Sequence, residues 1–130
     1  MSTPPPTLPM LLAVAGGGAT GAVLRSVLTD AGASVPATLA INVAGCLALG
    51  VLVARVRTRG ATWLFVGPGL LGGFTTMSAW AEQSRTLALG GSPALAALYV
   101  VLTPALCVGV ALVGMRLAAR PSGAGTEAGA

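Results

Sequence analysis

The side chains of this sequence that could bind or pass another molecule are neutral hydrogen-bonding groups inside apolar runs. Asn42 stands in the stretch LAINVAG, and Tyr99, Thr103 and Cys107 recur every fourth residue, which places them on one helix face. A carboxamide facing lipid is costly, so Asn42 must face either another helix or a wet path. Amide, hydroxyl and aromatic groups add no negative charge, which suits a small anion better than a cation. The row of Tyr99, Thr103 and Cys107 fits either hydrogen bonding between helices or the wall of a pathway.

The remaining polar residues do not support a catalytic role. The sequence has no histidine, and its acids stand in expected loops, at a helix edge or in the tail, at Asp30, Glu82 and Glu127. No acid–base pair and no nucleophile–base set can be assembled from them, so we expect no enzyme. The stretch GGGATG fits a dinucleotide-binding pattern, but no strand precedes it, which favours close helix packing. Cys46 and Cys107 lie in separate apolar runs, which predicts packing roles rather than a metal site or disulfide.

The elements that must hold these side chains are membrane-spanning helices. Hydrophobic residues make up 55% of the 130 residues and charged residues only 8%, against roughly 25% in a soluble domain. Four charge-free runs are each long enough for the ~20 apolar residues that cross a bilayer. We therefore predict an all-α integral membrane protein with one domain at 8–118, between disordered segments at 1–7 and 119–130. Its four spans are expected at about 8–28, 37–56, 61–88 and 94–117.

The third span differs from the others in its centre, which reads GPGLLGGFTTMSAW. Glycine and proline at this density weaken the helical hydrogen-bond ladder, so a break is predicted at membrane depth. Non-helical backbone is tolerated there only inside protein or along a polar cavity, and its freed carbonyls can bind a small cation. Glycines alone would favour close helix packing. The hydroxyl residues beside them favour a polar site; they are Thr75, Thr76 and Ser78.

Seven arginines and no lysines carry the positive charge, and their placement predicts an orientation. With four spans, both termini and the loop between the second and third spans lie on one side of the membrane. That side holds five arginines, which are Arg55, Arg57, Arg59, Arg116 and Arg120, and the other side holds Arg25 and Arg85. Because cytoplasmic loops carry an excess of basic residues, we expect both termini in the cytoplasm.

Four features occur in an order that resembles the Fluc (CrcB) family of fluoride channels. They are GGGATGAVLR, TLAINVAGCLALG, GLLGGFTTMSAW, and Tyr99 with Thr103 on the last span. The resemblance covers all four spans, and its motifs G-x-x-G-A-x-x-R, N-x-x-G and G-G-x-T-T-x-S are specific in combination. It implies a four-helix subunit of an antiparallel dimer in the cell membrane. Such a channel lets cytoplasmic fluoride leave passively and so relieves fluoride toxicity.

The resemblance also implies roles for single residues. Asn42 would donate to the ion from the second span, and Tyr99 and Thr103 would form a polar track on the fourth. Arg25 would stand near the aqueous vestibule, where its charge raises the local anion concentration; as an isolated residue it also fits an interfacial anchor. Fluoride is strongly hydrated, so a path must replace its water with closely placed donors, and uncharged donors bind it without trapping it.

The third span carries the remaining implied roles and two departures from the family pattern. Backbone carbonyls of Gly72 and Thr75 would hold a structural sodium ion at the dimer centre. The family motif T-T-F-S-T-F presents two phenylalanine ring edges to the ion, and here those pathway positions are Met77 and Trp80. Methionine has no positive ring edge, whereas tryptophan keeps one on a larger ring. Cys107 stands where the family often has a hydroxyl, and a thiol is a weaker donor.

The arginine bias is a further departure from the family's homodimers, which insert in both directions and keep their bias near zero. An antiparallel dimer then needs a partner of opposite bias, so we expect a heterodimer with an oppositely oriented paralogue. One competing interpretation is a small multidrug exporter, which needs a membrane-embedded carboxylate that the first span lacks. Another is a non-conducting accessory subunit whose glycines only pack helices.

Overall fold

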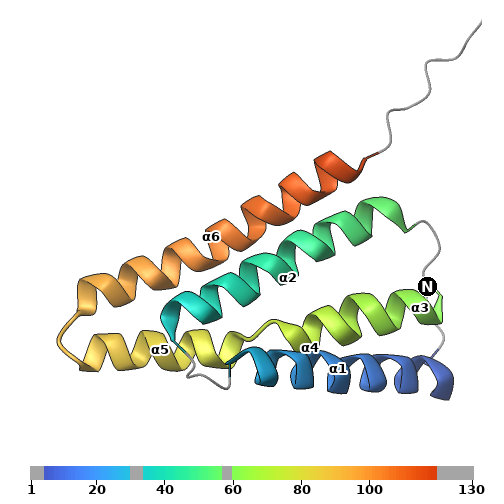
Figure 1. Ribbon diagram of the computed structural model, residues 1–130, viewed down its shortest axis with the longest axis horizontal. Helices are drawn as coiled ribbons and strands as arrows, with labels where there is room; N and C mark the ends of the chain where they lie inside the picture. The colour runs from blue at the N-terminus through green and yellow to red at the C-terminus, as the bar shows by residue number, and fades with distance from the viewer. Residues whose placement is uncertain (1–4, 30–33, 57–59, 120–130) are drawn as a thin grey trace, which may run out of the picture.

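The computed structural model describes residues 5–29, 34–56 and 60–119, and these residues form helices without any strand (Figure 1). In chain order the elements are α1 (Leu8–Thr29), α2 (Val35–Arg55), α3 (Ala61–Leu64), the π-helix η1 (Phe65–Leu71), α4 (Gly72–Phe74), α5 (Met77–Leu89) and α6 (Pro93–Ala118). The predicted all-α fold with a broken third span is confirmed. Of the two segments predicted to be disordered, residues 1–4 and 120–130 lie outside the described residues.

Within the described residues, three helices are long and apolar enough to cross a membrane: α1, α2 and α6. Their outer faces carry large exposed apolar side chains, as helices in contact with lipid require. Helix α2 begins at Val35, two residues earlier than predicted. The hydroxyl of Ser34 accepts a hydrogen bond from the N–H of Ala37, and Pro36 occupies the first turn, so the N-terminus is capped there.

The third pass is divided by a break at two threonines. Helices α3, η1 and α4 follow one another without a gap, and Pro68, which lacks an N–H, lies within the π-helix. The backbone then becomes extended at Thr75 (ψ 154°) and Thr76 (φ −137°, ψ 111°). Helix α5 begins at Met77, where the Thr76 hydroxyl accepts from the Ala79 N–H at 3.2 Å. The Gly-Pro-Gly stretch therefore lies where the helix changes from α to π type. The helical hydrogen-bond ladder ends at the extended threonines, and the Thr76 cap starts the next helix.

Close helix packing brings the four passes together. Helices α2 and α6 lie side by side, run in the same direction and form the most extensive pair (Figure 1). Gly50 permits their contact, because a Cβ at this position would overlap the carbonyl of Ala111. Helix α1 packs along the first half of the third pass in the same way, since a Cβ at Gly17 or Gly21 would overlap carbonyls of η1. The packing role predicted for GGGATG is thus confirmed.

The described arginines stand at different points along the bundle. The start of α1 and the ends of α2 and α6 lie together at one end (Figure 1). Arg55 and Arg116 belong to the last turns of α2 and α6 at this end, whereas Arg25 on α1 lies beside the break at Thr75 and Arg85 belongs to α5. The rest of the predicted bias falls on Arg57, Arg59 and Arg120, which lie outside the described residues. That both termini face the cytoplasm stays a prediction.

Candidate functional site

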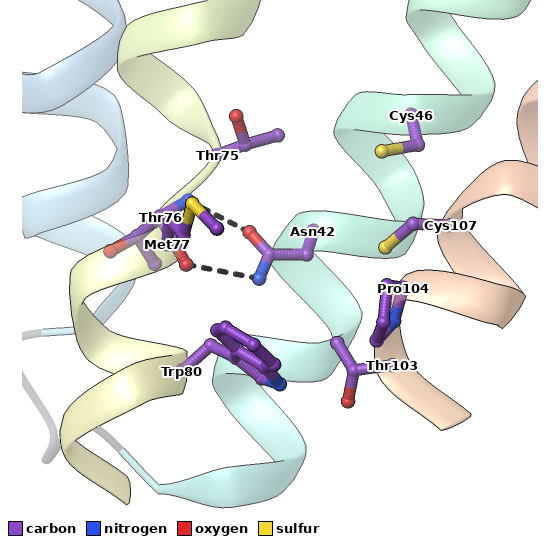
Figure 2. Close-up of a pocket in the computed structure, with 9 residues that line it drawn as sticks. All are labelled: Asn42, Cys46, Thr75, Thr76, Met77, Trp80, Thr103, Pro104 and Cys107. Atoms are coloured by element: carbon purple, nitrogen blue, oxygen red, sulfur yellow. Dashed lines mark hydrogen bonds between the residues drawn. The ribbon is translucent and has the colours of Figure 1, made fainter. Parts of the chain in front are cut away.

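The side chain of Asn42 on α2 holds the break in the third pass. Its Nδ2 donates to the carbonyl of Thr76 at 3.1 Å, and its Oδ1 accepts from the N–H of the same residue at 2.8 Å (Figure 2). Both residues are buried. The carboxamide therefore replaces hydrogen bonds that the extended backbone has lost at membrane depth. A carboxamide nitrogen has two N–H groups, so one donor of Asn42 remains for another acceptor.

Two further motif residues meet the same break at Thr75. The guanidinium of Arg25 on α1 donates through Nη1 to the Thr75 carbonyl at 3.3 Å. Gly45, the glycine of N-x-x-G, makes room for this threonine, because a Cβ there would lie 2.5 Å from its methyl carbon. The Thr75 hydroxyl donates back to the Leu71 carbonyl at 3.0 Å. The first two motifs thus converge on the threonines of the third.

A pocket of about 290 Å³ opens beside the break, between α2, α5 and α6 (Figure 2). Its wall consists of neutral side chains, namely Asn42, Cys46, Thr75, Thr76, Met77, Trp80, Thr103, Pro104 and Cys107. The hydroxyl oxygen of Thr103 is buried without a hydrogen-bond partner among the described residues. Such an unpaired buried hydroxyl costs about 1–3 kcal/mol, which favours a polar ligand beside it. The pocket brings together four of the predicted pathway residues: Asn42, Met77, Trp80 and Thr103.

Tyr99, the fifth predicted pathway residue, lies in a hydrogen-bonded chain next to this pocket. Its hydroxyl donates to Oε1 of Gln83 at 2.8 Å, and Nε2 of Gln83 donates to the Thr38 hydroxyl at 2.8 Å. The indole N–H of Trp80 donates to the Tyr99 carbonyl at 3.4 Å. Gln83 and Thr38 were not predicted as site residues from the sequence. The position of Gln83 one helical turn after Trp80 could have indicated it from the sequence. The contact with Thr38 depends on tertiary structure and could not.

A second pocket, of about 420 Å³, adjoins the first at Thr76 and contains Arg25. Its other lining residues are Thr29, Thr38, Ser78, Ala79 and Glu82. The Glu82 carboxylate is paired with Arg85 at 2.7 Å, so part of its negative charge is compensated within α5. Among the described residues Arg25 forms no salt bridge, so its positive charge beside this pocket attracts anions.

The two predicted sodium ligands occupy different surroundings. Gly72 is exposed and has open space above its Cα atom, and it lines neither pocket. The Thr75 carbonyl already accepts the hydrogen bond from Arg25. Met77 is 78% exposed, so this residue presents most of its surface outside the subunit. Gly72 thus lies at the surface of the subunit, whereas the Thr75 carbonyl is part-buried beside Arg25.

The fold and the site define a multi-pass α-helical membrane protein with a broken helix beside a pocket of neutral donors. The chain belongs to the CrcB family, because the family model described as "CrcB-like protein, Camphor Resistance (CrcB)" matches residues 12–115.

Relatives of known name support this assignment. The chain is 42% identical to the fluoride-specific ion channel FluC of Erythrobacter litoralis, over 90% of this chain and 96% of the relative. It is 41% identical to the protein of the same name from Paracoccus denitrificans, over 80% of this chain and 90% of the relative. The corresponding protein of Methylobacterium nodulans is 40% identical, over 83% of this chain and 92% of its own length. The similarity therefore extends over nearly the whole length of these relatives.

Proposed function

We propose that this chain is a subunit of a fluoride-specific ion channel in the cell membrane. It lets cytoplasmic fluoride leave passively, relieves fluoride toxicity and catalyses no reaction. Relatives that carry this channel name align with nearly the full chain, which supports the proposal. Motif residues by which the chain resembles this family meet at the break, Arg25, Asn42 and Gly45 among them.

The buried hydroxyl of Thr103 is the observation that carries the proposed path. It has no partner in the described structure and belongs to the wall of the neutral pocket. A fluoride ion accepts hydrogen bonds and would satisfy this donor together with the remaining N–H of Asn42. The indole edge of Trp80 adds a weakly positive surface, and Met77 adds none. Tyr99, positioned by Gln83, would continue the row of donors along α6. The charge of Arg25 would attract the ion into the second pocket, which would serve as the vestibule.

Fluoride release from liposomes tests this function. The purified chain, alone and together with its candidate partner, is reconstituted into liposomes loaded with potassium fluoride, and efflux is followed with a fluoride electrode. We expect release of fluoride but not chloride, and we expect Thr103→Val to slow it because the isosteric side chain has no donor. Equal release by the wild-type and Thr103→Val subunits would remove this hydroxyl from the path. Absence of release from both the single chain and the pair would contradict the function.

The working channel requires an antiparallel partner, which we infer to be a paralogue of opposite arginine bias. Five arginines on one side against two on the other favour a single orientation with both termini cytoplasmic. Two copies of a chain in one orientation cannot form an antiparallel pair. The exposed Met77 side chain and the exposed Gly72 lie where such a partner could cover them. Robust release from the pure single chain would contradict the heterodimer.

A structural sodium ion at this subunit contact belongs to the same proposal. The break frees backbone carbonyls near Gly72 and Thr75, and carbonyl oxygens are suitable ligands for a hard cation. A single subunit offers too few oxygens, so the partner would supply the rest. The guanidinium of Arg25 competes for the Thr75 carbonyl and would have to be displaced or share it. Replacing sodium by a large organic cation should lower the thermal stability of the assembled dimer and leave the single subunit unaffected.

A non-conducting accessory subunit is a second candidate, favoured by two observations. Asn42 already uses one N–H and its carbonyl to hold the break, and Met77 replaces an aromatic ring edge. In that case Asn42→Ala and Thr103→Ala would alter the stability of the assembled pair without changing its fluoride flux. A multidrug exporter is disfavoured, because α1 contains no acidic residue.

A further inference from the structure

The structure brings together the two cysteines of the chain, which lie far apart in the sequence. Cys46 on α2 and Cys107 on α6 are free, half-buried and part of the wall of the 290 Å³ pocket. Their sulfur atoms point into this pocket from neighbouring helices (Figure 2). Their positions in separate apolar runs gave no indication that they would meet. The parallel packing of α2 and α6 brings both thiols to the wall of one pocket.

Matching four-residue spacings on the two helices produce this juxtaposition. On α2 the facing residues are Thr38, Asn42, Cys46 and Gly50, and on α6 they are Tyr99, Thr103, Cys107 and Ala111. The first pair is bridged by Gln83, and the last pair is in backbone contact. The thiols therefore sit between two fixed contacts, in a position that the helix packing holds in place.

We propose that Cys46 and Cys107 together bind one soft, two-coordinate metal cation, such as Hg²⁺, Ag⁺ or Cu⁺, and that the bound metal closes the fluoride path. Soft thiolate sulfur selects such ions over hard cations. Zinc ordinarily takes four ligands, and no group of three or more histidine, cysteine or acidic residues occurs in the described part of the chain. Two ligands on facing helices match the ions that prefer two bonds.

The binding step balances with mercuric chloride as the incoming reagent. Each thiol loses its proton, and each sulfur forms one bond to mercury as one chloride leaves. The products are a neutral sulfur–mercury–sulfur bridge, two protons and two chloride ions, with no change of oxidation state. Mercuric chloride is itself neutral, so it reaches a pocket at membrane depth. The bridge would fill space next to Asn42 and Thr103 and would tie α2 to α6.

Intact-mass spectrometry of the full-length protein tests the site without reference to transport. We expect the wild type to hold one mercury atom with no chloride, and the Cys46→Ser, Cys107→Ser double variant to hold none, since it has no thiol. Each single variant should hold one mercury atom with one chloride. The glutathione concentration that removes this mercury should be about 100-fold lower than for the wild type. Two mercury–chloride adducts on the wild type, or equal retention by a single variant, would overturn the dithiol site.

Fluoride release tests the closure, which rests on the proposed function. Mercuric chloride should stop release by the wild type in liposomes and leave the double variant at its own metal-free rate. Each protein is compared only with itself before metal addition, so a slower double variant does not affect the result. Equal inhibition of the double variant would overturn closure through these thiols. No release before the metal is added would contradict the channel function instead, and the mass measurement would still decide the dithiol site.

Discussion

At the scale of single residues, Asn42 accounts for how a broken helix is stable at membrane depth. The carboxamide of Asn42 pairs with both polar backbone atoms of Thr76, as a neighbouring strand would. In water the solvent would supply these hydrogen bonds, but lipid supplies none. The same side chain keeps one free donor at the pocket wall. Structural support and proposed ion contact are therefore combined in one group.

The two roles of Asn42 are separated by two substitutions. Asn42→Ala removes both partners of Thr76 and should cost about 1–3 kcal/mol of stability for each unpaired backbone group. Asn42→Asp keeps the acceptor for the Thr76 N–H but places a negative charge at the pocket wall. We expect the alanine variant to lose both thermal stability and fluoride flux, and the aspartate variant to lose flux with a smaller loss of stability. Full flux in the aspartate variant would exclude Asn42 from ion contact.

Tyr99→Phe tests the hydrogen-bonded chain beside the pocket. The substitution removes the donor to Gln83 and leaves the Trp80 bond intact, because that bond ends on the Tyr99 backbone carbonyl. We expect a loss of about 1 kcal/mol in stability and slower fluoride release. Thermal melting in detergent and liposome efflux measure the two effects. Lower stability with unchanged efflux would make Tyr99 purely structural.

At the scale of elements, the parallel pair α2 and α6 determines which side chains share the pocket. Their close approach depends on Gly50, above whose Cα the carbonyl of Ala111 lies. Both helices repeat small or polar residues at every fourth position. One close contact therefore sets the register of the two helices and decides which residues face each other. The polar wall of the pocket is thus a consequence of helix register.

Gly50→Ala should disturb this register. The added Cβ would overlap the Ala111 carbonyl, so the helices must separate or slide, and overpacking of this kind costs about 1–3 kcal/mol. Gly109→Ala is the matched control, since a Cβ there meets no atom within 4 Å. We expect lower thermal stability and reduced flux only for the Gly50 variant. Equal behaviour of the two variants would show that the α2–α6 contact tolerates an added methyl group.

At the scale of the whole molecule, we expect the arginine distribution to set how the subunit is oriented in the membrane. Arg55 and Arg116 belong to the last turns of α2 and α6 at one end, whereas Arg25 and Arg85 belong to α1 and α5. The direction of four alternating passes makes this separation possible. In the antiparallel dimer proposed above, a subunit of fixed orientation would need a partner of opposite orientation.

Neutral substitution of Arg55, Arg57 and Arg59 should abolish the fixed orientation. It leaves two arginines on each side, so the insertion bias disappears. A reporter fused to the C-terminus should give only a cytoplasmic signal in the wild type and a mixed signal in the triple variant. If the bias alone prevents self-pairing, the triple variant should also gain release as a single chain. An unchanged cytoplasmic signal would mean that other features set the orientation.

The sequence by itself determined the number of passes, the position of most helix ends and the presence of a broken third helix. These follow from local properties: charge-free length, caps, and the density of glycine, proline and threonine. The tertiary structure decided what depends on helix register, because residues from separate runs meet only when the helices pack. Gln83 between Thr38 and Tyr99, and Cys46 beside Cys107, belong to this second class. The break predicted within GPGLLGGFTTMSAW lies at Thr75 and Thr76, because Asn42 from another helix stabilises the extended backbone at those residues.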